Sequence, residues 1–227
     1  MLLFTAQEPD GKIIGVFTVT PPHPIIVFLK NDSHMEEAAS PFIHFMLREH
    51  IPIYGFVGKK THVDLLHSVY DKICNPSINF IMQQGVYQLT NLVDLQHASG
   101  KMVTLDESSI PFLANCHVHF NQDCQLPAIS VTEATKNVTA FIKDRSVFGW
   151  QVEGKIVSIA KASRPTKHGI TVNFVFTPNE YRRKGYARTL VWHLTTDLTN
   201  PTSNKIYKEI GYKFLYKSKH IQYDTDK

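Results

Sequence analysis

Cysteine is scarce in this sequence, with only Cys74, Cys116 and Cys124 among 227 residues. The number is odd and the positions are widely scattered. A disulfide framework of the kind that staples small secreted domains is therefore excluded as the basis of the fold. Free thiols persist in a reducing compartment, so we expect a cytoplasmic protein.

Long apolar runs are also lacking. No stretch approaches the roughly 18 uncharged apolar residues of a membrane span. The opening segment MLLFTAQEPD has neither the charged start nor the long apolar core of a signal peptide, so we expect no membrane partner. Apolar residues still make up 43% of the composition, which is enough to form a buried core in one or two domains.

Net charge is small, at +4, but it is unevenly distributed. Up to Ala98 there are 6 Lys and Arg against 9 Asp and Glu, whereas from Ser99 onward there are 18 against 11. A basic second half favours an anionic partner there, although a solvated basic face would give the same count. The basic residues are not interleaved with aromatic residues in a known nucleic-acid-binding pattern, so we expect no nucleic-acid partner.

Hydrophobic periodicity predicts a mixed α/β chain. Apolar, alternating segments typical of strands occupy 12–29, 51–58, 78–95, 147–165 and 169–178. Proline residues at 21, 22 and 24 should divide the first of these, and the fourth should be a hairpin that turns at Glu153-Gly154.

Helical spacing is found over 34–50, 61–73, 109–122 and 131–146. Pro41 should break or restart the first of these helices, and Ser130 or Thr132 should cap the last. Residues 96–108 have the composition of a linker. We therefore expect two domains, 1–98 and 99–227.

The stretch EYRRKGYART, residues 180–189, follows the predicted strand that ends at Pro178. A helix is expected to begin near Gly185, and its first N–H groups have no intrahelical acceptor. Such a turn binds phosphate, glycine lets a ligand approach the backbone, and the preceding cations add charge. The GxGxxG and GxxxxGK[ST] motifs are absent, and a surface turn with fortuitous cations remains an equal alternative on this stretch alone.

This stretch resembles the acetyl-coenzyme A loop of the GNAT superfamily of N-acetyltransferases, Q/R-x-x-G-x-G/A, here residues 182–187. Downstream, TDLTNPTSNKIYKEIGYKF is similar to the segment that closes the family's site. The resemblance covers roughly residues 100–218. It implies an α/β fold (α+β by stricter naming) with a mixed, mostly antiparallel sheet flanked by helices. A smaller α/β domain, similar to the degenerate extra domain of some members, would precede it.

The family's chemistry implies acetyl-CoA as co-substrate, a primary amine as acceptor, direct attack without an acyl-enzyme, and no metal. Tyr207 matches the residue that protonates the departing thiolate, although an apolar-face residue of a helix would also fit there. The residues implied in cofactor binding lie on the strand, in the loop and in the closing segment: Val175, Phe176, Thr177, Arg182, Arg183, Lys184, Gly185, Tyr186, Ala187, Arg188, Ser203 and Asn204.

Several alternatives stay open. A non-catalytic acyl-CoA-binding or regulatory protein could keep the same loop. No general base is evident: Glu180 favours a solvated role, and Glu153, His168 and Asp197 are unranked. The Cys and His residues over 116–124 could form a zinc cluster, but their spacing fits no common site and disfavours this reading. The acceptor's identity and the assembly state, a homodimer included, are also open.

The connection between Ala187 and Asn204 is short for the family. A helix over 185–193 would run directly into a strand over 194–198, whereas a parallel crossover needs about a dozen residues. Either the crossover is shortened or a segment is missing from the sequence, and we favour a missing segment near residues 192–196.

Overall fold

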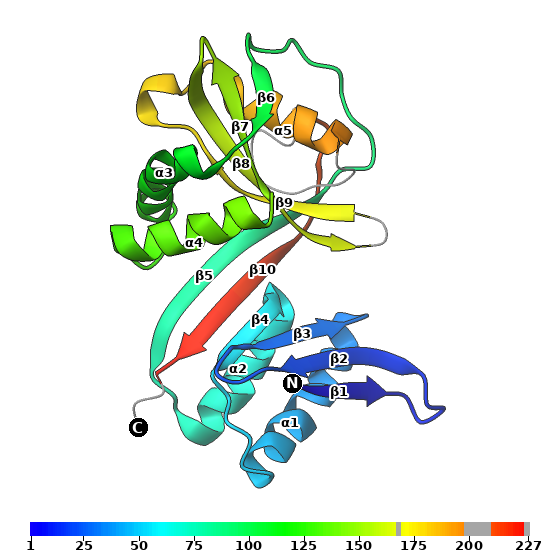
Figure 1. Ribbon diagram of the computed structural model, residues 1–227. Helices are drawn as coiled ribbons and strands as arrows, with labels where there is room; N and C mark the ends of the chain where they lie inside the picture. The colour runs from blue at the N-terminus through cyan, green and yellow to red at the C-terminus, as the bar shows by residue number, and fades with distance from the viewer. Residues whose placement is uncertain (167–168, 198–209, 225–227) are drawn as a thin grey trace. The chain divides into compact units, whose positions relative to one another are not determined.

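The computed structural model describes residues 1–166, 169–197 and 210–224 (Figure 1). By its internal contacts the chain separates into unit 1, residues 1–86 with 215–227, and unit 2, residues 87–214. The division at residue 98 is still a prediction. It differs from these units because the end of the chain returns to unit 1.

Unit 1 is built on a six-stranded sheet in the order β1-β2-β3-β4-β10-β5 among the described residues. β3 and β4 are parallel, while β1–β2, β2–β3 and β4–β10 are antiparallel. The elements are β1 (Leu2–Gln7), β2 (Ile13–Val19), β3 (Ile25–Leu29), α1 (Asp32–Arg48), β4 (Gly55–Lys59), α2 (Lys60–Cys74), β5 (Ile78–Gln88) and β10 (Lys213–Tyr223).

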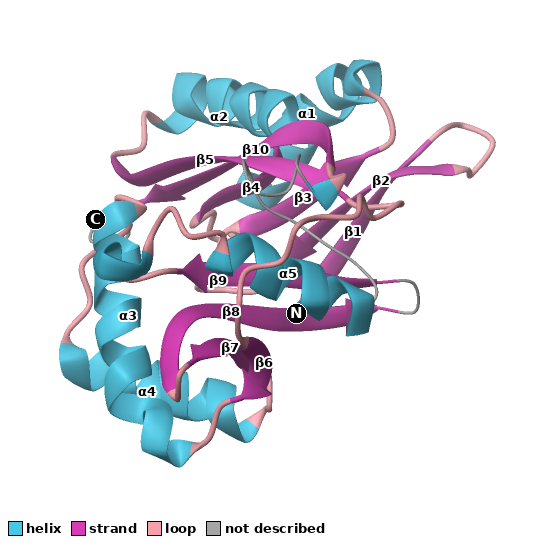
Figure 2. Ribbon diagram, turned by 90° about the horizontal axis from the view of Figure 1, so that it is seen from above, coloured by secondary structure: helices cyan, strands magenta, loops and turns pink. Residues whose placement is uncertain are grey.

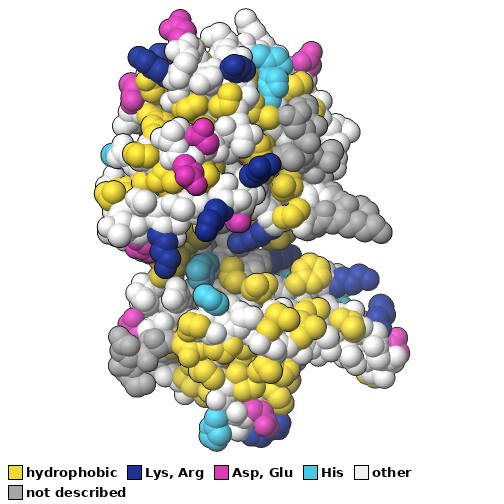
Figure 3. Space-filling view, viewed as in Figure 1, with side chains coloured by type: hydrophobic (Ala, Val, Ile, Leu, Met, Phe, Trp, Pro, Cys, Tyr) yellow, Lys and Arg dark blue, Asp and Glu magenta, His cyan; other side chains and the backbone are white. Residues whose placement is uncertain are grey.

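Strict alternation places one face of β3 in the core. Its odd-numbered residues are buried, whereas Ile26 and Phe28 are exposed. Helices α1 and α2 cover the buried face (Figure 2), where Ile43, Met46 and Leu66 are fully buried. Burying each such side chain contributes about 1.5–3 kcal/mol. Hydrophobic side chains are also visible on the surface of unit 1 in Figure 3.

The expected break at Pro41 is wrong, because α1 continues through it. Pro41 is exposed, so its missing N–H lies on the solvent side of the helix. Phe42, Ile43 and Met46 are buried on the core side. Their packing offsets the roughly 3 kcal/mol that an interior proline costs.

Gly55 is required where β4 meets β10. Its φ is +145°, and a Cβ built there would lie 2.0 Å from the carbonyl oxygen of Ile221. Only a residue without a side chain permits this approach.

Unit 2 contains a four-stranded antiparallel sheet in the order β6-β7-β8-β9 among the residues described. Its strands are β6 (Lys101–Thr104), β7 (Val147–Val152), β8 (Lys155–Thr166) and β9 (Gly169–Phe176). The helical segments are η1 (Glu107–Ser109), α3 (Ile110–Asp123), α4 (Val131–Lys143), η2 (Asn179–Tyr181) and α5 (Tyr186–Asp197).

The two faces of this sheet have separate cores. Leu190, Val191 and Leu194 of α5 are fully buried on one face, together with Trp150. The other face is covered by α3 and α4 (Figure 2), and Leu113 is fully buried there. The mixed α/β fold with mostly antiparallel sheets flanked by helices is as expected.

Local predictions in unit 2 are largely confirmed. Glu153 (φ 48°) and Gly154 (φ 80°) turn the β7–β8 hairpin, as an Xaa-Gly turn with two positive φ values does. Ser130, rather than Thr132, caps α4 by accepting a hydrogen bond from the Glu133 N–H at 3.1 Å. The expected linker over 96–108 contains β6, which is a correction.

The expected helix over 185–193 is present from Tyr186, but the expected strand over 194–198 is wrong where the structure describes it. Helix α5 runs without interruption from Tyr186 to Asp197, so Leu194 to Asp197 form helix and not strand. No break occurs at 192–196. The helix persists because Leu190 and Leu194 lie one turn apart and are both buried. Leu198 lies outside the described residues.

Candidate functional site

Strand β9 contains a bulge near its C-terminal end. Ile159 of β8 pairs with Phe176 and Lys161 pairs with Asn173, so β9 holds one extra residue between these two positions. Phe174 has a φ of 49°, which is rare for a bulky residue. The bulge changes the alternation: Val172 packs under α5, whereas Phe174 packs under α3 and α4. It therefore re-aims the strand's backbone groups.

One edge of β9 is paired with β8, and no strand in the described part of the chain pairs with its other edge. As far as the described strands go, backbone N–H and C=O groups on that edge lack a strand partner and could pair with an extended ligand. Val175 lies at the C-terminal end of β9, and Thr177 follows directly after the strand.

A tight turn leads from β9 into α5. Arg183 (φ 65°) and Gly185 (φ 80°) both adopt positive φ, and Tyr186 begins the helix. The carbonyl oxygen of Gly185 accepts a hydrogen bond from the Thr189 N–H at 3.0 Å. The positive end of the helix dipole thus lies at the turn, which favours an anion.

The turn forms one wall of a pocket of about 660 Å³. Nine residues predicted to bind the cofactor line this pocket: Val175, Phe176, Thr177, Arg182, Arg183, Gly185, Tyr186, Ala187 and Arg188. Lys184 is not among the lining residues, and its Nζ lies 5.8 Å from the centre of the Tyr181 ring. Ser203, Asn204 and Tyr207 lie outside the described residues.

The side chain of Arg182 is hydrogen-bonded to other residues of the chain. Its Nε donates to the carbonyl oxygen of Thr177 at 2.8 Å, and its Nη2 donates to Asp123 Oδ2 at 2.5 Å. The guanidinium also lies 5.4 Å from the centre of the Phe176 ring. The strand end, the turn and α3 are therefore joined through one side chain.

Sequence reasoning missed the contribution of α3 to the pocket. Phe120, Asp123 and Cys124, at the end of this helix, line it together with Tyr181. Asp123 precedes its partner Arg182 by 59 residues, and no local motif links them. The one signal in the sequence was the position of Asp123 at the C-terminal end of a predicted helix. A carboxylate is unfavourable there unless it is paired with a cation.

The cysteine and histidine residues over 116–124 are not grouped as metal ligands in the described part of the chain. Among the described residues no group of three or more Cys, His, Asp or Glu side chains could hold a metal ion. Burial raises the pKa of Cys116 to about 12, and the charge of Glu180 adds to this effect. Cys116 is thus a thiol at neutral pH and a poor nucleophile. Burial also lowers the pKa of His117, whose ring lies 5.0 Å from that of Phe174.

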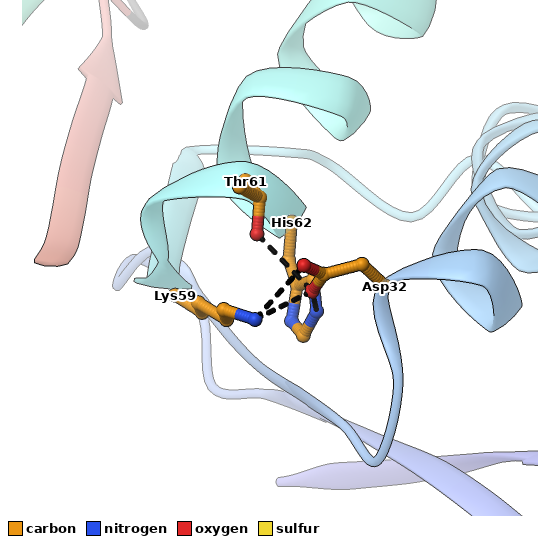
Figure 4. A network of polar contacts seen from close by, with 4 residues as sticks. All are labelled: Asp32, Lys59, Thr61 and His62. Carbon is orange, nitrogen blue, oxygen red and sulfur yellow. Dashed lines mark hydrogen bonds and ion pairs between the residues drawn. The ribbon is translucent and has the colours of Figure 1, made fainter. Parts of the chain in front are cut away.

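A second polar cluster lies in unit 1, where α1 and α2 begin after the parallel strands β3 and β4 (Figure 4). Asp32 accepts hydrogen bonds from Lys59 at 2.7 and 2.9 Å and from Thr61 at 3.2 Å, and it lies 2.8 Å from His62 Nε2. These contacts link the N-terminal ends of α1 and α2.

The ionisation of this cluster is shifted by its contacts. The hydrogen bond from Lys59 holds the pKa of Asp32 below its usual value. Burial lowers the pKa of His62, although the contact with Asp32 opposes this effect. His62 is 2% exposed, so it favours the neutral form.

None of the described helices has the length and apolarity that a membrane span requires.

Residues 115–212 match the sequence profile of the Acetyltransferase (GNAT) family. This region includes α3, α4, β7 to β9, the turn and α5. No curated protein matches the chain.

Solved structures with the same fold include an acetyltransferase from the GNAT family of Colwellia psychrerythraea. It has a TM-score of 0.56 and 11% identity, and the match covers 98% of this chain and 85% of that one. A GCN5-related N-acetyltransferase from Sphaerobacter thermophilus has a TM-score of 0.58 and 10% identity, with 97% and 80% covered. At such identities the likeness concerns the fold alone.

Proposed function

From the match of residues 115–212 to the Acetyltransferase (GNAT) family, we propose that the chain is a GNAT acetyltransferase and that it transfers the acetyl group of acetyl-CoA to a primary amine. Acyl transfer is the family's activity. The donor, the acceptor class and the mechanism are our proposal.

The observation that carries the proposal is the pocket between the end of β9 and the start of α5. It combines a helix N-terminus, a glycine at φ 80°, neighbouring cations and a strand edge with which no described strand pairs. The helix start suits the pyrophosphate of CoA, since its N–H groups lack intrahelical acceptors. The strand edge suits the amide-containing pantetheine arm, which can pair with backbone groups as an added strand would.

In the proposed reaction the neutral amine attacks the thioester carbonyl carbon directly. A backbone N–H beside the bulge, near Val175, polarises the carbonyl oxygen as negative charge develops there. The C–S bond then breaks, the thiolate of CoA leaves, and Tyr207 supplies its proton. The amine loses a proton to solvent, since no base is assigned.

A second candidate is an acyl-CoA-binding or regulatory protein without turnover. The described residues of the pocket supply features that suit CoA but no assigned general base, so they also fit this candidate. Such a protein would use the same pocket.

The test is the release of free CoA thiol from acetyl-CoA across a panel of primary amines, with calorimetric titration of CoA alongside. Amine-dependent release supports the acetyltransferase. Binding of CoA without release on any acceptor supports the second candidate, and absence of both overturns the assignment of the pocket.

We further propose that the protein acts in the cytoplasm. Its three cysteines are unpaired, with Cys74 and Cys124 exposed, as in a reducing compartment. We also propose that the protein requires neither nucleic acid nor metal, and that residues 1–97 bind no second CoA.

A further inference from the structure

Arg182 is the first residue of the loop motif, and its position raises the question of how it acts. A cation in an anion-binding loop is expected to contact phosphate directly. In this structure two of its nitrogens already donate hydrogen bonds, from Nε to the Thr177 carbonyl and from Nη2 to Asp123. The guanidinium is thereby directed toward α3 and the strand end.

Asp123 lines the same pocket as Arg182. A carboxylate beside a bound pyrophosphate would repel it unless its charge were neutralised. The 2.5 Å contact with Arg182 provides that neutralisation. The side chains of Arg182 and Asp123 are 39% and 46% exposed, so the strength of the pair is that of a partly solvated bridge.

We propose that Asp123 is a positioning residue for CoA binding and that Arg182 acts through the bridge to Asp123, not by contacting phosphate. The bridge fastens the end of α3 to the end of β9. It holds Thr177 and the start of the turn in the conformation that presents Gly185 and the first N–H groups of α5. This inference rests on the proposed function of the pocket.

The experiment is a double-mutant cycle on CoA affinity, measured by calorimetry, with D123N, R182Q and the double variant. D94N is the matched control, since Asp94 is an exposed aspartate of the same unit that does not line the pocket. We expect D123N to weaken binding about three- to fivefold. R182Q should weaken it more, because it leaves an unpaired carboxylate in an anion site. The double variant should bind no worse than R182Q, and D94N should match the wild type.

Direct phosphate contact by Arg182 predicts different results. D123N would then release Arg182 toward the phosphate and bind CoA as tightly as the wild type or more tightly. R182Q would cost the same factor whether or not Asp123 is present. Either result overturns the inference.

Steady-state kinetics separate positioning from a general loss of structure. D123N should raise the KM for acetyl-CoA and leave kcat unchanged at saturating acetyl-CoA. If D123N does not fold, the reversed pair D123R/R182D provides the test. A CoA affinity of D123R/R182D near that of the wild type supports the bridge, and a CoA affinity as poor as that of R182Q contradicts it. Wild-type protein that binds no CoA would refute the proposed function itself, whereas additive effects in a CoA-binding protein refute only this inference.

Discussion

Replacing Gly185 by valine should weaken CoA binding more than it lowers stability. A Cβ at this position would meet Arg188 Nη2 at 3.7 Å and the Ala98 Cβ at 3.9 Å, which are ordinary contacts. The stability cost therefore comes from the backbone, because a φ of +80° is unfavourable for a residue with a Cβ. That cost is about 1–2 kcal/mol, or a melting temperature lower by roughly 2–8 °C for a chain of this size.

The cost in binding comes from the pocket, because Gly185 lines it and a side chain would hold the phosphate away from the turn. We expect CoA affinity to fall at least about tenfold, which corresponds to about 1.4 kcal/mol. Calorimetric titration of CoA and thermal unfolding of the same samples would measure the two effects.

Two further variants separate strain from obstruction. Gly185→Asn should recover most of the stability, since asparagine tolerates positive φ, but it should still bind poorly. Gly154→Ala is the matched control, because Gly154 has the same φ in an open turn, and it should lose stability without losing affinity. The reasoning is refuted if Gly185→Asn binds CoA as the wild type does.

Three other predictions follow from particular contacts. Tyr207→Phe should lower kcat and leave acetyl-CoA affinity intact; an unchanged kcat when chemistry limits the rate would remove Tyr207 as the acid. Burial lowers the pKa of His62 in the folded protein from its usual 6.5. The stability that neutral His62 contributes is therefore complete above pH 6.5 and is lost as the pH falls through the lowered pKa of the folded state. His62→Gln should flatten that part of the curve, as urea unfolding from about pH 8 to about pH 4 would show. Gly55→Ala should destabilise by at least about 3 kcal/mol, because its Cβ would lie 2.0 Å from a backbone oxygen; a loss no larger than that of Gly154→Ala would contradict the close approach of β4 to β10.

Local rules predicted the features that depend on a few adjacent residues. The cap at Ser130 and the turn at Glu153-Gly154 each follow from short-range hydrogen bonding and backbone sterics. The loop over 182–187 was located for the same reason, since strand, glycine and helix start are contiguous in sequence.

Tertiary packing decided the features that local rules missed. Burial of Phe42 and Met46 stabilises α1 on both sides of the interior Pro41, and burial of Leu190 and Leu194 stabilises the C-terminal part of α5. The contact between Asp123 and Arg182 joins residues 59 positions apart, so no window of sequence contains it. Similarly, Asp32 and His62 meet only because β3 and β4 are parallel neighbours.

The most direct test of the account follows a deuterated acetyl group from acetyl-CoA by mass spectrometry, in the presence and absence of a primary amine. The account predicts label on the acceptor nitrogen, stoichiometric release of CoA, and an unlabelled protein in both samples. Label on the protein that is discharged by the amine would contradict direct attack. Label that stays on bound CoA with every amine would contradict acetyl transfer.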